Sequence, residues 1–341
     1  MEEKAVKNIK KLGFQWETQD PFLFCAYHKD LFPPGNEHLG PKASLEGRNI
    51  GQDFTLKNGW RMYHGSKVPG FPAHPHKGFE TVTLVDQGFA DHSDSLGAAG
   101  RFGNGDVQWM TAGKGVMHCE MFPLLDQQNE NPLLLFQIWL NLPSYKKNVD
   151  PHFKMLWSDS IPLQVLEDEN GNKTTIKIIS GQLDGVKGPA PAPDSWAADP
   201  NNEVAIWKIH MEPHSKWVIP SIQAGINRTL FFYEGSEIEA EGMKVPEGHS
   251  LDLVSDKEIS LQNGNLAAEI LFLQGRPINE PVVQHGPFVM NSNLEINQAI
   301  KEYQLTQFGG WPWSGYEHTH AKDRTRFALH ADGREEIKNI Q

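Results

Sequence analysis

The stretch HPHKGFETVTLVDQG at residues 74–88 and the stretch GDVQWMTAGKGVMHCEM at residues 105–121 carry the strongest signals in this chain. Each stretch contains two side chains of metal-ligand type that are separated by one residue: His74 with His76, and His118 with Glu120. In an extended strand, side chains two residues apart point to the same face. Each pair therefore offers two candidate ligands to one side of a strand.

Three imidazoles and one carboxylate suit a divalent first-row metal ion, and four protein ligands on an octahedral ion leave positions open for water, substrate or oxygen. This ligand set favours Fe(II), Mn(II) or Ni(II) over a closed structural zinc site. A single histidine is far more often structural than a ligand, but two pairs at same-face spacing on successive strand-like segments favour a metal site. The sequence predicts one divalent metal ion held by His74, His76, His118 and Glu120.

Strand-like segments lie between the two pairs. Residues 80–85 are rich in β-branched side chains, Gly88 follows as a turn residue, and residues 107–110 resume a strand-like pattern. This order of strand, turn and strand predicts a β-hairpin. Cys119 stands between two predicted ligands, so it should point to the opposite face as a small buried side chain.

The two stretches, together with FQIWLNL at residues 136–142 and EPVVQHGPFVMNSNLEI at residues 280–296, resemble the pirin family of the cupin superfamily. The resemblance implies an all-β fold of two tandem cupin domains, which are jelly-roll-like β-barrels, with a few short helices, one of them near the C-terminus. It also implies iron as the metal, in the Fe(II) state, with Mn, Ni, Cu or Zn as alternatives.

An internal repeat supports the second barrel. RTLFFYEG, which ends at Gly235, is similar to ETVTLVDQG, which ends at Gly88, and PEGHSLDLVS at residues 246–255 is similar to GNGDVQWMTA at residues 103–112. In this alignment the four predicted ligands stand opposite residues that bind hard or borderline divalent ions poorly: Ser221, Gln223, Leu261 and Asn263. We therefore expect an N-terminal metal-binding barrel at residues 1–150, a metal-free barrel at 151–308 and a C-terminal extension at 309–341.

Glu80 is an alternative carboxylate ligand. In most cupins a Glu four residues after the His-x-His pair binds the metal, whereas in pirins the carboxylate comes two residues after the later histidine. The resemblance and the same-face spacing both favour Glu120 as the ligand. Glu80 is four residues from His76, which would place both on one face of a continuous strand, so Glu80 could still face inward and orient an imidazole.

The tail after the second barrel contains one predicted helix. Asn293 is suited to cap a helix that begins with Leu294, and in pirins this segment returns to pack on the first barrel. The histidines of His318-Thr319-His320 have no second pair, which predicts an exposed loop, whereas Trp311-Pro312-Trp313 could cover a barrel mouth or a subunit interface.

The composition limits the cellular location that we expect for the protein and the kinds of partner that it could bind. A formal net charge of -12 argues against direct binding to nucleic acid, because phosphate neutralisation requires clustered Lys and Arg. A mean hydropathy of -0.50 and the absence of a membrane-length apolar run argue against a membrane protein. The charged start and two widely separated cysteines, Cys25 and Cys119, indicate a cytoplasmic protein.

Two functions fit these features. Some pirins open flavonols such as quercetin with dioxygen, which implies a small aromatic substrate. In that case Glu120 would be the catalytic group that takes the proton of a substrate hydroxyl. Phe79 and Trp109 would form the walls of a pocket for a flat ring. The alternative is a non-enzymatic regulator that binds a protein partner according to the metal or its redox state. A storage or scaffold barrel would bind metal without either activity. Fold alone does not choose among them, and the sequence does not indicate the oligomeric state.

Overall fold

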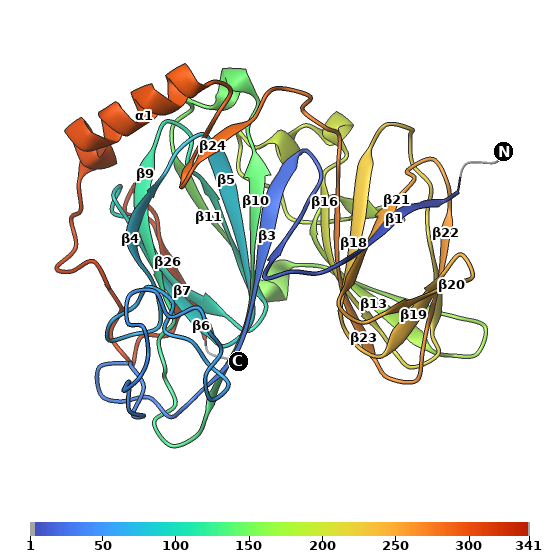
Figure 1. The fold of residues 1–341 in the computed structure, drawn as a ribbon, viewed down its shortest axis with the longest axis horizontal. Helices are drawn as coiled ribbons and strands as arrows, with labels where there is room; N and C mark the ends of the chain where they lie inside the picture. Colours follow the sequence, from blue (N-terminus) through green and yellow to red (C-terminus); the bar gives the residue numbers. More distant parts are fainter. Residues whose placement is uncertain (1–3, 340–341) are drawn as a thin grey trace. The chain divides into compact units, whose positions relative to one another are not determined.

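β-Strands dominate residues 4–339, the part of the chain that the computed structural model describes (Figure 1). Within these residues there is one α-helix, α1 (Asn293–Thr306). Five 3-10 helices are also present: Ser144–Lys146, Ser158–Ser160, Trp196–Ala198, Pro200–Asn202 and Gln307–Gly309. The prediction of an all-β fold with a helix near the C-terminus is confirmed. None of the described helices has the length and apolar character needed to span a lipid bilayer.

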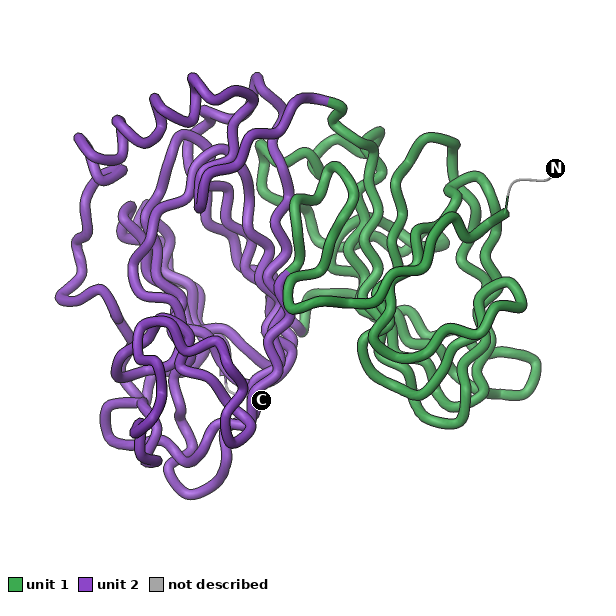
Figure 2. The backbone as a smooth tube through the Cα atoms, viewed as in Figure 1, with its two compact units in different colours: residues 1–25, 159–279 green, residues 26–158, 280–341 purple. Residues whose placement is uncertain are grey.

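The chain forms two compact units, and each joins segments that are distant in sequence (Figure 2). Unit 1 combines the chain up to residue 25 with residues 159–279, and unit 2 combines residues 26–158 with the chain from residue 280 onward. The limits 1–150, 151–308 and 309–341 remain a prediction of where the two repeats and the extension begin and end.

Unit 2 contains the two sequence stretches described above and is built from two facing sheets. Strands of the first sheet, in their spatial order, are β11 (His152–Leu156), β8 (Asp106–Thr111), β5 (Phe79–Gln87), β10 (Asn131–Asn141) and β3 (Phe22–Phe32), which belongs to this unit from Ala26 on. Strands of the second sheet are β27 (Glu335–Lys338), β26 (Arg326–Leu329), β7 (Ala99–Gly103), β6 (Phe89–Asp94), β9 (Val116–Met121) and β4 (Gly70–His76).

The predicted hairpin between residues 80–85 and 107–110 is wrong, although the two segments are antiparallel neighbours. Leu84 pairs with Val107 in β5 and β8, as a hairpin would require. The chain between them, however, crosses to the second sheet and forms β6 and β7 there before it returns. Crossing between two sheets is typical of a jelly roll, in which neighbouring strands are often distant in sequence.

Unit 1 has an apolar interior. Its large sheet contains β1 (Val6–Lys11), β21 (His249–Leu253), β18 (Asn227–Glu234), β23 (Ala268–Gly275), β16 (Ala205–Met211), β13 (Lys173–Ser180) and β12 (Leu163–Glu167). Its small sheet contains β17 (Lys216–Ile219), β22 (Ile259–Asn263), β19 (Glu237–Ala240) and β20 (Met243–Pro246). Leu261 belongs to the apolar core, and the amide of Asn263 donates to three backbone carbonyls. That this barrel holds no metal stays a prediction.

The C-terminal return to unit 2 begins with a hairpin of β24 (Val283–His285) and β25 (Phe288–Met290) and continues into α1 (Figure 1). The cap of α1 is Ser292 rather than Asn293. Its hydroxyl accepts from the backbone N–H of Glu295, whose carboxylate in turn accepts from the backbone N–H of Asn291. This reciprocal capping resembles a capping box and sets the start of the helix.

Lys147 anchors this return segment from inside unit 2. Its ammonium is buried and donates to the carbonyl of Gly78 (2.9 Å), the side chain of Asn141 (2.8 Å) and the carbonyl of Val289 (3.2 Å). Burial lowers the pKa of Lys147 from 10.5 to about 8, because these acceptors are neutral. Holding the charge therefore costs stability at neutral pH.

The cost of this buried charge should disappear as the pH rises. Between about 8 and 10.5 the unfolded chain binds the proton more tightly than the folded chain, so the free energy of unfolding increases with pH. From about pH 7 to pH 9 we expect the wild type to gain about 1–2 kcal/mol relative to Lys147→Met. Denaturant unfolding measures this difference. A difference between wild type and Lys147→Met that does not change with pH would contradict the expectation.

Candidate metal centre

Three of the four predicted ligands converge in unit 2. β4 and β9 are hydrogen-bonded neighbours, and His74 lies opposite His118 in their register. The candidate ligand atoms of His74, His76 and His118 all lie within 4.8 Å of one another. The ring centroids are separated by 4.5 Å for His74 and His118 and by 4.8 Å for His76 and His118. The same-face spacing on each strand and the pairing of the strands therefore place three imidazoles around one point.

The hydrogen bonds of these rings fit a metal site. His74 Nδ1 lies 2.8 Å from the carbonyl of Pro72, to which it can donate, and this leaves Nε2 as an acceptor. His74 Nε2 lies 3.1 Å from His76 Nε2. His118 is fully buried, yet neither of its nitrogens has a hydrogen-bond partner among the described residues. A buried polar group without a partner costs about 1–3 kcal/mol, and coordination to a metal ion would satisfy it.

The three rings are also in the protonation state that a metal requires. Burial lowers the pKa of His74 to about 4, and it lowers the pKa values of His76 and His118 well below the ordinary value for histidine. At neutral pH all three imidazoles are uncharged, so each keeps a lone pair for coordination.

Glu120 lies beside this cluster but is held by other partners. Within residues 4–339, the group of ligand atoms that lie within 4.8 Å of one another contains only the three histidines. Glu120 is buried and accepts a hydrogen bond from the Thr83 hydroxyl (3.0 Å) and another from the Gln137 amide. Burial raises the pKa of Glu120. Its role as a ligand stays a prediction, and its raised pKa suits a group that takes up a proton.

The sequence reasoning missed a polar row that faces Glu120 from the first sheet. Gln108 and Gln137 lie on either side of Thr83 in the register of β8, β5 and β10. Side chains at directly paired positions share a face, so all three lie on the inner side. The Gln108 amide is buried and has no hydrogen-bond partner among the described residues. Polar residues at alternating positions of otherwise apolar strands were the available signal.

Aromatic rings line the site beside His76. The Phe79 ring lies 5.0 Å and the Trp139 ring 5.2 Å from the His76 ring, and the two aromatic rings are 4.0 Å apart. Trp109, the other predicted wall, lies on the opposite face of the first sheet. Its indole N–H donates to Glu80 (3.1 Å), and the Thr111 hydroxyl donates to Glu80 as well (2.7 Å).

Glu80 therefore does not face the histidines, and the inward orientation that its spacing from His76 allowed is not the one the structure has. If residues 76–80 formed one continuous strand, Glu80 would lie on the same face as His76. The chain, however, leaves β4 at Lys77, turns at Gly78 with a φ of +86°, and enters β5 in the other sheet. Alternation does not carry through such a turn, so Phe79 rather than Glu80 points to the site.

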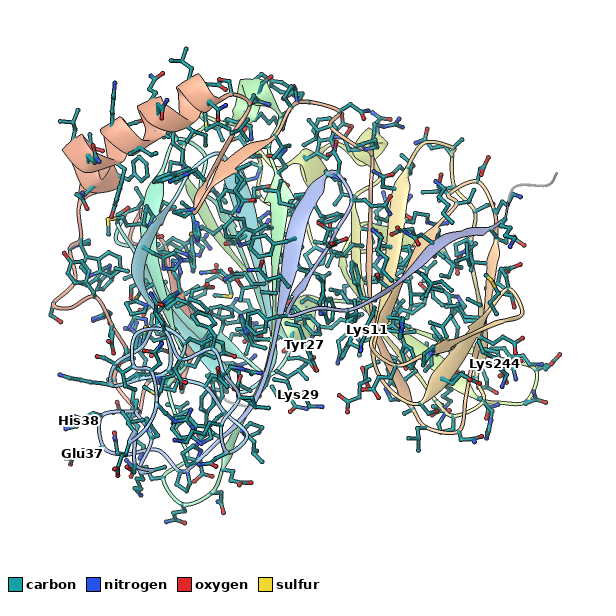
Figure 3. All side chains as sticks on the ribbon, viewed as in Figure 1. Lys11, Tyr27, Lys29, Glu37, His38 and Lys244 are labelled. Atoms are coloured by element: carbon teal, nitrogen blue, oxygen red, sulfur yellow. The ribbon has the colours of Figure 1, made fainter. Side chains whose placement is uncertain are left out.

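Other histidines stand outside the cluster. The His92 ring, on β6, stacks on Phe153 and lies 5.4 Å from the His118 ring, so it forms a second layer behind the site. His38, labelled in Figure 3, is exposed on a loop and pairs with Glu37.

Cys119 is buried on the opposite face of β9, as predicted, where its thiol contacts the carbonyl of His318.

Comparison with known proteins identifies relatives with this architecture. The chain matches the Pirin family over residues 6–140 and the Pirin C-terminal cupin domain over residues 206–309. It is 36% identical over 240 residues to a Pseudomonas aeruginosa protein named "Putative quercetin 2,3-dioxygenase", covering 70% of this chain and 79% of the relative. It is 32% identical over 252 residues to human pirin, covering 72% of this chain and 80% of the relative.

A solved structure agrees with the sequence matches. Quercetin 2,3-dioxygenase from Acinetobacter baumannii superimposes with a TM-score of 0.70 at 25% identity, covering 90% of this chain and 98% of the other. The two family matches and the relatives together span both barrels of this chain, and the resemblance inferred from the His-x-His and His-x-Glu pairs is confirmed. This chain belongs to the pirin family.

Proposed function

We propose that this chain is an Fe(II)-dependent dioxygenase that acts on an aromatic substrate of the flavonol type. The ion would be held by His74, His76, His118 and Glu120. The observation that carries the proposal is the buried His118 ring, whose two nitrogens have no partner among the described residues although two neutral imidazoles stand beside it. The names of the Pseudomonas and Acinetobacter relatives support the substrate class.

A bound divalent ion would supply Lewis-acid and redox chemistry at its open coordination positions. The remaining tasks fall to residues of this chain. Glu120, whose pKa is raised by burial, would take the proton of a substrate hydroxyl, while Thr83 and Gln137 hold its two oxygens in place. The paired rings of Phe79 and Trp139 would limit the site to a flat ligand and exclude water from it.

Gln108 is suited to orient the substrate. Its free amide offers one donor face and one acceptor face on the inner side of the barrel. For Gln108→Leu we expect the KM for a flavonol to rise about 10-fold with a smaller change in kcat, because one hydrogen bond to the substrate is lost. The melting temperature should stay the same or rise, because no internal hydrogen bond is broken. An unchanged KM with a clear loss of stability would instead indicate a structural role for Gln108.

The first test is elemental analysis of protein purified without oxygen, combined with oxygen uptake on addition of quercetin. About one iron per chain with metal-dependent uptake is the expected result. Metal without uptake would favour the alternative, a regulator that binds a protein partner according to its metal or redox state. Protein that neither retains nor takes up a divalent ion would contradict the metal centre itself.

The proposal includes a cytoplasmic location and a class of binding partner. Cys25 and Cys119 are both buried and neither forms a disulfide, which agrees with the reducing conditions of the cytoplasm. A small aromatic molecule is the proposed partner, and we propose neither nucleic acid nor a membrane as a partner because of the negative net charge and the low mean hydropathy.

A further inference from the structure

A segment beyond the family matches lies against the strands that carry the metal ligands. We call residues 311–320 the C-terminal strap; the matched region ends at residue 309. After the strap, β26 pairs with β7 at one side of the second sheet, whereas β4, with His74 and His76, is the opposite edge (Figure 1). The strap therefore spans the outer face of the sheet between these two edges.

The strap contacts the ligand-bearing strands in turn. The carbonyl of Tyr316 accepts from the backbone N–H of Ala73 (2.8 Å), the residue before His74. On β9, the Cys119 thiol contacts the carbonyl of His318. On β6, the carbonyl of Asp94 accepts from the indole N–H of Trp313, and the carbonyl of His92 lies within hydrogen-bond distance of the His320 ring. Residues 318–320 form a loop, as predicted, but His320 is buried, so the expectation that this loop is exposed is wrong.

β4 has an incomplete hydrogen-bond ladder and is held in part by contacts from outside its sheet. It is an edge strand whose sheet neighbour is β9, and its register with β9 is interrupted between Phe71 and His74. Pro75 has no N–H to donate to a neighbour. The Ala73 N–H, which lies within this irregular part, donates to the strap instead of to β9. The position of His74 and His76 thus depends on contacts outside the sheet ladder.

Glu317 is the anchor of the strap. One of its carboxylate oxygens accepts from the backbone N–H (2.8 Å) and the hydroxyl (2.5 Å) of Ser66, and the other accepts from the backbone N–H of Lys67 (3.0 Å). Hydrogen bonds to a carboxylate are roughly twice as strong as neutral ones. Ser66 and Lys67 lie in the loop that leads directly into β4, so this contact fixes the entry to the strand from which two imidazoles project.

We propose that Glu317 is a positioning residue for the metal centre: through the strap it holds β4 in the geometry in which His74 and His76 can bind an ion together with His118. The inference rests on the proposed metal site and adds a residue to it that lies outside the matched region. It requires that metal affinity, and not only stability, depends on Glu317.

Titration with Co(II) tests this role, because the visible absorption of bound Co(II) reports its coordination geometry. For Glu317→Ala we expect the Kd for Co(II) to rise about 10- to 100-fold, as for residues that orient metal ligands, with altered visible bands. Glu317→Gln and Ser66→Ala each remove only part of the anchor and should fall between this variant and the wild type. They also keep the test valid if Glu317→Ala does not fold.

Glu335→Gln is the matched control. Glu335 pairs with Arg324 in the same C-terminal extension but contacts neither β4 nor the loop before it in the described contacts. This variant should keep the wild-type Kd and spectrum. If the wild type binds Co(II) and all three anchor variants have its Kd and spectrum, the positioning role is overturned while the metal site stands. If the wild type does not bind Co(II), the metal site and the positioning role both fail.

Discussion

Replacing His118 with alanine should lower the affinity for a divalent metal ion by at least about 100-fold while the barrel stays folded. His118 stands at the centre of the cluster, with both other imidazoles within 5 Å of its ring centroid. Because neither of its nitrogens makes a hydrogen bond among the described residues, the substitution breaks no internal polar contact. The cost in stability should be that of a small cavity, about 1–3 kcal/mol. Metal content after dialysis and competition with a chelator measure the affinity.

His28→Ala is a suitable control for this variant. His28 is also a buried histidine of unit 2, but its ring packs on Tyr63 and it is not part of the cluster. Its removal leaves a similar cavity and should leave metal affinity within about 2-fold of the wild type. Full metal occupancy of His118→Ala at wild-type affinity would show that the three imidazoles do not bind an ion together.

Glu120→Gln should lower metal affinity by about 10- to 100-fold and, when metal is saturating, lower kcat for a flavonol by about 100-fold or more. The substitution keeps the shape of the side chain but removes the negative charge and the ability to take up a proton. It also exchanges one acceptor oxygen for a donor, and the Thr83 hydroxyl can accept from the new amide N–H while the remaining oxygen accepts from Gln137. Chelator competition gives the affinity, and oxygen uptake at saturating metal gives kcat.

Glu80→Gln provides the matched comparison, because it makes the same change in a buried carboxylate on the other face of the first sheet. Metal affinity and kcat should both stay near wild type in this variant. If Glu120→Gln binds metal as tightly as the wild type but loses kcat, Glu120 acts on the substrate and is not a ligand. If Glu80→Gln is the variant that loses metal, the carboxylate has been assigned to the wrong residue.

Local spacing in the sequence accounts for much of the site. His74 with His76, and His118 with Glu120, are separated by one residue, and the two-residue period of a strand fixes which side chains share a face. The same period places Cys119 on the outside, where the structure has it. The internal repeat and the family resemblance added the second barrel, because homologous segments keep their strand pattern even where Leu261, on β22, stands in place of His118.

The spacing of residues could not predict side-chain orientation at the places where the chain passes from one sheet to the other. Alternation stops at the turn through Gly78, so the face of Glu80 depends on which sheet β5 joins. The row of Gln108, Thr83 and Gln137 exists only because three strands distant in sequence become neighbours. The strap reaches β4 from more than 200 residues away, since Glu317 binds Ser66 across a separation of 251 positions. Sequence periodicity determined the faces of individual strands, and tertiary packing decided which faces meet, because strand pairing and strap contacts are long-range interactions that no local pattern encodes.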